Sequence, residues 1–132
     1  MRIGSSIAVL ASLAASGLAQ AQTSQFERGA YIVNNVAMCG DCHTPHGPNG
    51  PIAGQTLAGA PLPFAPLHPM PWADRTPRLA GLPAGYTQAD LAHLLQTGKR
   101  PNGAEPRPPM PAYRMNERDA KAVAAYIASL KP

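Results

Sequence analysis

A proline- and glycine-rich middle segment constrains the folding of this 132-residue chain more than any other feature. Between residues 44 and 83 it contains TPHGPNGPIAG and GAPLPFAPLHPMPW. Proline removes a backbone donor and clashes with the preceding helical turn, so no helix of useful length fits there. Irregular segments of this length are uncommon in compact domains. We therefore expect the segment to cover something flat and apolar, using the side chains of Leu57, Leu62, Phe64, Leu67, Met70 and Trp72.

Helical patterns lie on both sides of this middle segment. Apolar residues recur at helical spacing in three stretches: roughly residues 25–38, 87–97 and 116–130. Thr87 and Asp90 occupy capping-box positions, and Gly98 suits the residue that ends a helix. Asn116 is a favourable cap for the last helix. No segment alternates convincingly like a strand, so the sequence predicts an all-α fold with about three main helices and long proline-rich loops.

The first 21 residues have the pattern of an export signal. Arg2 precedes an uncharged apolar stretch, and AQA at residues 19–21 fits the small-residue rule for cleavage after Ala21. The apolar stretch is shorter than the about 20 residues that a membrane span needs. The sequence therefore predicts a signal peptide at 1–21 and one exported domain at 22–132, with an uncleaved N-terminal anchor as the alternative.

The charge pattern excludes several function classes. The formal net charge is +4 at pH 7, and no block of five or more like charges occurs. Aromatic and basic residues do not interleave, so the chain has no nucleic-acid footprint. No nucleophile–base pair, carboxylate pair or glycine-rich phosphate loop supports catalysis. The mild positive charge favours an acidic partner surface at most.

The only two cysteines, Cys39 and Cys42, lie three positions apart and directly precede His43. A disulfide between them would close a very small loop, stabilise little and leave His43 without a role. A thioredoxin-like dithiol requires a βαβ pattern, which is absent from the sequence. A zinc site needs four ligands. The remaining histidines lack zinc-finger spacing and are expected at the surface: His46, His68 and His93.

The pattern C-x-x-C-H accounts for all three residues at once. Each thiol can add to one vinyl group of haem, and the adjacent histidine is then the proximal iron ligand. The motif thus favours one covalent haem c bound through Cys39 and Cys42, with His43 on the iron. A thioether on the opposite side would raise the potential and close the iron to small ligands. Met70 and Met110 are both held between prolines, and the residues alone leave both as candidates.

Three segments together carry a family resemblance: CGDCHTP, LLQTGKRPNG and MPAYRMNERDAKAVAAYIASL. With them, residues 25–131 resemble class I mono-haem cytochromes c, most closely the bacterial periplasmic members, some of which act with membrane-bound dehydrogenases. The resemblance implies that Met110, which precedes Pro111, is the distal ligand, with Met70 as its rival. It also implies that the terminal helices cross at a glycine packed by an aromatic, and Gly29 and Tyr126 fit these roles.

The resemblance also implies a function. We expect an electron carrier rather than an enzyme, located in the periplasm, free as a monomer or part of a dehydrogenase complex at the membrane. Its donor would be a dehydrogenase or quinol-oxidising complex, and its acceptor an oxidase or another cytochrome. The alternatives are a haem-based sensor or ligand binder with an open distal site, and a thiol–disulfide oxidoreductase. The candidate donors to the haem propionates are Trp72, Arg75 and Arg78.

Overall fold

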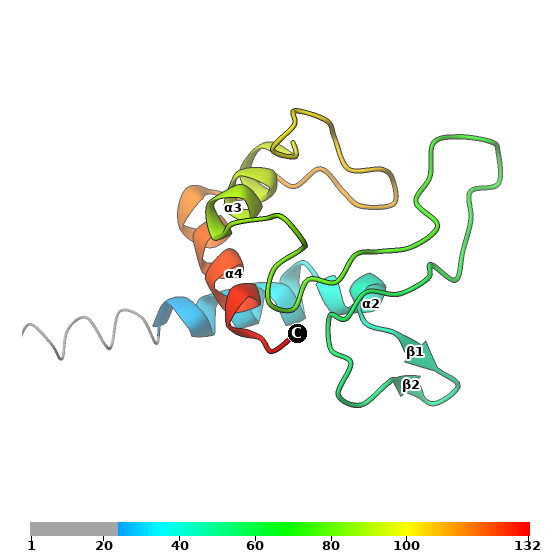
Figure 1. Cartoon of the computed structure of the whole chain (residues 1–132), viewed down its shortest axis with the longest axis horizontal. Helices are drawn as coiled ribbons and strands as arrows, with labels where there is room; N and C mark the ends of the chain where they lie inside the picture. Colours follow the sequence, from blue (N-terminus) through cyan, green and yellow to red (C-terminus); the bar gives the residue numbers. More distant parts are fainter. Residues whose placement is uncertain (1–23) are drawn as a thin grey trace, which may run out of the picture.

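The computed structural model describes residues 24–132, so the signal peptide expected at residues 1–21 lies outside the described part. The longer helices gather on one side of the molecule, and long loops extend from them on the other (Figure 1). In chain order the elements are a helix over residues 24–31, the π-helical turn η1 (Ile32–Val36), α2 (Cys39–His43), β1 (His46–Gly47), β2 (Gly50–Pro51), α3 (Gln88–Thr97) and α4 (Glu117–Ser129). Within residues 24–132 no helix has both the length and the apolar character of a membrane span.

The two later helices begin and end where local sequence signals predict. The Thr87 hydroxyl accepts from the backbone N–H of Asp90, and the Asp90 carboxylate accepts from the N–H of Thr87, which completes the capping box of α3. Gly98 ends α3 in the left-handed region at φ 70°. The Asn116 side chain caps α4 by accepting from the N–H of Asp119. The all-α class is confirmed, and the caps of α3 and α4 lie at the residues that the sequence predicts.

The first helix crosses α4 at Gly29. A Cβ built on Gly29 would overlap the carbonyl of Ala122 and lie 2.8 Å from Cβ of Tyr126. No side chain larger than hydrogen fits such a contact, because the two backbones approach too closely. This explains a glycine inside a helix, where it costs about 1 kcal/mol relative to alanine. The expected roles of Gly29 and Tyr126 at the crossing are confirmed.

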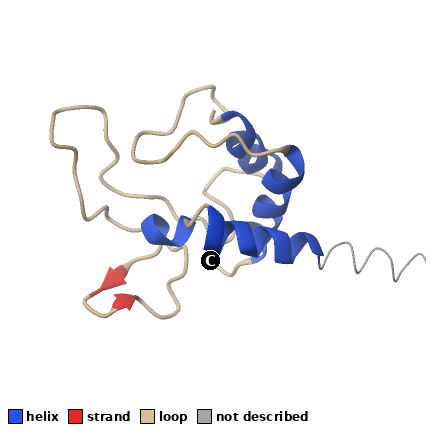
Figure 2. Cartoon of the chain, turned by 180° about the vertical axis from the view of Figure 1, so that it is seen from behind, coloured by secondary structure: helices blue, strands red, loops and turns tan. Residues whose placement is uncertain are grey.

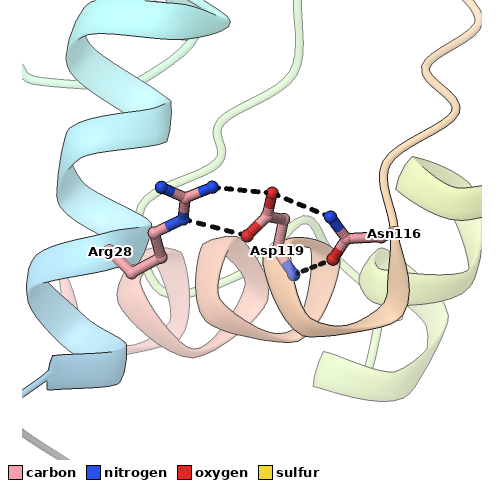
Figure 3. Close-up of polar contacts among 3 residues, drawn as sticks. All are labelled: Arg28, Asn116 and Asp119. Carbon is pink, nitrogen blue, oxygen red and sulfur yellow. Dashed lines mark hydrogen bonds and ion pairs between the residues drawn. The ribbon is translucent and has the colours of Figure 1, made fainter.

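An ion pair joins the same two helices at their surface. The guanidinium of Arg28 donates from Nε and from a terminal nitrogen to the two carboxylate oxygens of Asp119, at 2.9 and 3.0 Å (Figure 3). Asn116 donates to the same carboxylate at 3.1 Å while its own oxygen caps the helix. The hydrogen bonds from Arg28 lower the pKa of Asp119 below its ordinary value. The two hydrogen bonds of this ion pair therefore help to fix the orientation of the first helix relative to α4, at the crossing that Gly29 permits.

Two short features differ from the expectation. The first helix ends at Val36 instead of residue 38. Its last N–H, that of Ala37, donates to the carbonyl of Ile32 in a π-type bond of 2.7 Å, and Met38 then turns into the left-handed region at φ 49°. A small antiparallel hairpin pairs His46 with Pro51, and its strands of two residues are too short to show an alternating pattern in the sequence.

The middle segment only partly covers the core. Leu57 is fully buried and joins a core cluster with side chains of all the longer helices, among them Val33, Leu91, Leu95, Val123 and Ile127. Leu62 and Trp72 are half-buried. The remaining three apolar side chains, Phe64, Leu67 and Met70, do not join the core and are exposed on a loop that leaves it.

Candidate functional site

Helix α2 carries the whole C-x-x-C-H motif on little more than one turn. It begins after Met38, which is left-handed at φ 49°, directly behind the π-helical turn η1. It ends at His43 because Thr44 is extended and precedes Pro45, which disfavours helical geometry in the residue before it. Cys39 and Cys42 are separate free thiols, both half-buried. The local sequence therefore places two thiols and one imidazole together on one short helix.

The ring of His43 is buried and its orientation is set by a distant backbone carbonyl. His43 is 6% exposed, and its Nδ1 lies 2.9 Å from the carbonyl oxygen of Pro77. Because a carbonyl only accepts, Nδ1 carries the proton and Nε2 keeps its lone pair. Burial lowers the pKa of His43, and the hydrogen bond to Pro77 opposes this effect. A neutral imidazole with Nδ1 anchored in this way is the arrangement that proteins use to present Nε2 to a metal.

The segment that carries Pro77 is pressed against Gly59. Gly59 is left-handed at φ 81°, and a Cβ there would lie 2.7 Å from the nitrogen of Arg78 and 2.8 Å from the carbonyl carbon of Pro77. The N–H of Gly59 donates to the carbonyl of His43 at 2.7 Å. Gly59 thus holds the helix end and the Pro77 segment together, and the sequence alone identifies neither Gly59 nor Pro77 as part of the site.

Thr76 adds a second connection between that segment and α2. Its hydroxyl lies 2.9 Å from the carbonyl oxygen of Cys42, to which it donates, and it accepts from the N–H of Ala60 at 3.0 Å. Donation to Cys42 also satisfies a carbonyl at the C-terminal end of the helix, where no helical partner remains. Through these two bonds the hydroxyl of Thr76 connects the backbone of Cys42 with that of Ala60, next to the segment that carries Pro77.

The surroundings of the cysteines bear on two of the alternative sites, the redox-active dithiol and the zinc site. Burial raises the pKa of the Cys39 thiol to about 11. Redox-active cysteines instead have lowered pKa values, because the thiolate is the nucleophile. No group of three or more His, Cys, Asp or Glu side chains within residues 24–132 is arranged to hold a metal ion. The geometry therefore favours neither the dithiol nor the zinc site.

The two candidate methionines have different surroundings. Met70 is 51% exposed on the loop that leaves the core. Met110 is half-buried, and its N–H donates to the carbonyl of Arg107 at 3.3 Å. Three residues later, the hydroxyl of Tyr113 donates to the carbonyl of Ala37 at 3.1 Å. The segment that carries Met110 is thus bound to the residues just before Cys39, and the segment that carries Met70 has no such bond there.

Tyr113 belongs to the site although no sequence motif indicates it. Burial raises its pKa, and the nearby thiols of Cys39 and Cys42 add to this shift. Its ring packs against the buried core cluster. Its hydroxyl accordingly bridges the C-terminal segment and the end of the first helix across 76 positions of sequence.

The expected propionate donors divide into one buried and two exposed groups. Nε1 of Trp72 is buried and has no hydrogen-bond partner within residues 24–132. Buried donors are nearly always satisfied in proteins, so this N–H calls for an acceptor. Arg75 and Arg78 are exposed. Haem fits these groups. The two thiols match its vinyl groups, the lone pair on Nε2 of His43 matches its iron, and the unsatisfied N–H of Trp72 matches one of its carboxylates.

The other histidines lie away from this arrangement. They are exposed, as expected from the sequence: His46, His68 and His93. His46 is engaged locally, because its Nδ1 lies 2.7 Å from the carbonyl oxygen of Thr44.

The chain matches a known protein family. The family model described as cytochrome c matches residues 26–131, which is most of the chain. No curated protein gives a significant match. The family carries a covalently attached c-type haem and transfers electrons with it, and its members are generally electron carriers rather than enzymes. Cys39 and Cys42 are consistent with the attachment motif of that haem.

Proposed function

The chain belongs to the cytochrome c family, and from this membership we propose that it is a periplasmic carrier of single electrons whose haem iron is bound by His43 and Met110. The haem supplies an iron that alternates between the ferric and ferrous states. The polypeptide would attach the haem through Cys39 and Cys42, orient the side chains of His43 and Met110 and keep water away from the metal.

The hydrogen bond between His43 and Pro77 is the observation that supports the proximal half of this proposal most strongly. It directs Nε2 away from the carbonyl and raises the basicity of the ring, which strengthens a bond from Nε2 to iron. Gly59 and Thr76 hold the two segments in register, so the imidazole is oriented by the fold itself. A ligand oriented in this way need not reorganise when the charge of the iron changes, which favours fast electron transfer.

The distal half of the proposal rests on the environment of Met110. Two observations support it: Met110 is half-buried, and Tyr113, three residues later, is bonded to Ala37, two residues before Cys39. Met70, by contrast, lies on an exposed loop. A rigid, half-buried segment suits a weak thioether ligand, because little conformational entropy is lost when the ligand binds.

Replacing each methionine tests this ligand. In the holoprotein we expect Met110→Ala to lower the reduction potential, abolish the long-wavelength absorption band of methionine-bound ferric iron and admit carbon monoxide to the ferrous iron. Met70→Ala, the matched control, should leave all three properties unchanged. The reverse pattern would assign the ligand to Met70. A wild-type protein that lacks the band and binds carbon monoxide freely would instead support a ligand binder or sensor with an open distal site.

The proposal also covers where the protein is located and which proteins exchange electrons with it. The apolar start of the chain and its small-residue cleavage site support a signal peptide at residues 1–21 and a periplasmic domain. A dehydrogenase or quinol-oxidising complex is the proposed donor, and an oxidase or another cytochrome the acceptor. Cell fractionation with N-terminal sequencing of the mature protein tests export. Purification from native membranes shows whether it is free or part of a dehydrogenase complex.

A further inference from the structure

Two adjacent residues at the end of α2 are bonded to two adjacent residues of the segment that carries Pro77. The ring nitrogen Nδ1 of His43 donates to the carbonyl of Pro77 at 2.9 Å. The residues that precede these two are bonded as well, because the hydroxyl of Thr76 lies 2.9 Å from the carbonyl oxygen of Cys42. Two peptide-linked pairs and two hydrogen bonds therefore close a ring of four residues, in which Thr76 supplies the hydroxyl.

The single proton of the Thr76 hydroxyl has two carbonyl oxygens within reach. The carbonyl of Cys42 lies at 2.9 Å and that of Ala60 at 3.2 Å. The Ala60 carbonyl already accepts from the backbone N–H of Thr76 at 2.8 Å. The Cys42 carbonyl lies in the last turn of α2, where carbonyls lack helical donors. The hydroxyl proton therefore belongs to the bond with Cys42.

A buried donor holds the same hydroxyl from another direction. The N–H of Ala60 donates to it at 3.0 Å, and Ala60 is 5% exposed. A buried N–H without an acceptor is costly, so this bond is strongly favoured. Threonine is also stiff about χ1, because it is branched at Cβ. The hydroxyl of Thr76 is therefore fixed between the N–H of Ala60 and the carbonyl of Cys42.

The position of the Pro77 carbonyl depends on its neighbours in the chain. Proline has no N–H, so Pro77 donates no backbone hydrogen bond of its own. Residues 57–60 and 76–79 are loops without helix or strand (tan in Figure 2), so no regular ladder of backbone bonds fixes them. Thr76, the residue next to Pro77, therefore supplies the side-chain bond that ties this carbonyl to the helix end that carries His43.

We propose that Thr76 is a positioning residue for the proximal ligand, and that its hydroxyl sets the reduction potential by fixing the Pro77 carbonyl against Nδ1 of His43. The proposal rests on the ligation of iron by His43 that is proposed above, and it adds a residue that controls the strength of that ligation. The hydrogen bond at Nδ1 makes Nε2 a stronger donor. A stronger donor favours the ferric state, so the Thr76 hydroxyl holds the potential below the value that a looser ring would give.

A purely structural role is the alternative, and Thr44 offers a matched comparison. Its hydroxyl accepts from the N–H of Leu57 at 3.0 Å at the same end of α2, and Thr44 is 6% exposed. None of its hydrogen bonds within residues 24–132 reaches Thr76 or Pro77. Loss of either hydroxyl removes the acceptor of a buried N–H, but only the loss at Thr76 frees the Pro77 carbonyl.

Three variants of the holoprotein test the proposal. Thr76→Val removes the hydroxyl and keeps the branched shape, Thr76→Ser keeps the hydroxyl, and Thr44→Val is the matched control. A redox titration measures the reduction potential, and NMR of the ferrous protein with isotope-labelled histidine measures the solvent exchange rate of the Nδ1 proton of His43.

We expect Thr76→Val to raise the potential and to speed the exchange of the Nδ1 proton about tenfold, the scale of one lost hydrogen bond. Thr76→Ser should keep the wild-type potential and exchange rate, because the hydroxyl is restored. Thr44→Val should also keep both, while it lowers the midpoint of denaturant unfolding.

The wild-type holoprotein provides a second test, which does not depend on how well Thr76→Val folds. Because the hydroxyl proton of Thr76 is held by the carbonyl of Cys42, we expect it to exchange slowly enough to give a resonance in the proton NMR spectrum of the ferrous protein. A hydroxyl proton that exchanges too fast to be observed would contradict the fixed bond, and the proposal with it.

The outcomes that overturn the proposal differ from those that overturn the proposed function. A Thr76→Val protein with the wild-type potential and lowered stability would show that the hydroxyl is structural only. An equal rise of the potential in Thr44→Val would show that the potential follows any loosening of the helix end. Ring resonances of His43 without the upfield ring-current shift of an iron-bound imidazole would instead contradict ligation by His43 itself.

Discussion

At the scale of single residues, the groups that orient the site come from distant parts of the chain. His43 was identifiable because it adjoins Cys42 in a short motif. Its acceptor Pro77 lies 34 positions away, and Tyr113 contacts Ala37 across 76 positions. Sequence spacing reports neighbours within one element, and contacts between loops leave no periodic signal. The ligand-bearing motif could therefore be predicted, and the residues that position it could not.

Tyr113→Phe tests whether the bond to Ala37 positions the distal segment. We expect it to lower the free energy of unfolding by about 1 kcal/mol, the typical net contribution of one hydrogen bond. It should also increase the affinity of the ferric iron for added imidazole, because a looser segment releases Met110 more readily. Denaturant titration and imidazole titration of the holoprotein measure the two effects. Tyr86→Phe, on another half-buried tyrosine next to the core, is the control. Unchanged imidazole affinity in Tyr113→Phe would show that the bond is structural only.

At the scale of elements, the helices whose ends depend on local chemistry could be predicted almost to the residue. The capping box of α3, its final Gly98 and the Asn116 cap of α4 all depend on residues within four positions of one another. The π-helical turn η1 is instead closed by the bond from the N–H of Ala37 to the carbonyl of Ile32, and no residue type in it signals this bond. The crossing at Gly29 was predictable only because a family resemblance supplied the partner helix.

Gly29→Ala tests the crossing between the first helix and α4. The added Cβ would overlap the Ala122 carbonyl, so the helices must separate. We expect a net loss of about 1–3 kcal/mol in the free energy of unfolding, typical of overpacking, despite the better helix propensity of alanine. Gly40→Ala is the control, because a Cβ there makes only an ordinary contact of 3.5 Å with the Thr44 hydroxyl. Chemical denaturation of the two holoproteins provides the comparison, and equal stability would contradict the close contact.

At the scale of the whole molecule, a small helical core carries loops that only partly pack on it. Leu57 and Leu79 join the core, and Gly59 presses the Pro77 segment against α2. The loop of residues 62–74 reaches outward instead, and its Phe64, Leu67 and Met70 side chains are exposed. Proline and glycine content predicts the absence of helices there. It does not determine the path of the loop, because that path depends on turns and backbone bonds that many sequences could form.

The central claim is that the chain is built around a haem bonded to Cys39 and Cys42. The most direct measurement is the intact mass of the matured protein under denaturing, reducing conditions, with Cys39→Ala/Cys42→Ala as the control. We predict that the wild-type mass exceeds that of the polypeptide by one haem, which persists after acid–acetone extraction, and that the double variant loses this added mass. A wild-type mass equal to that of the polypeptide alone would contradict the account.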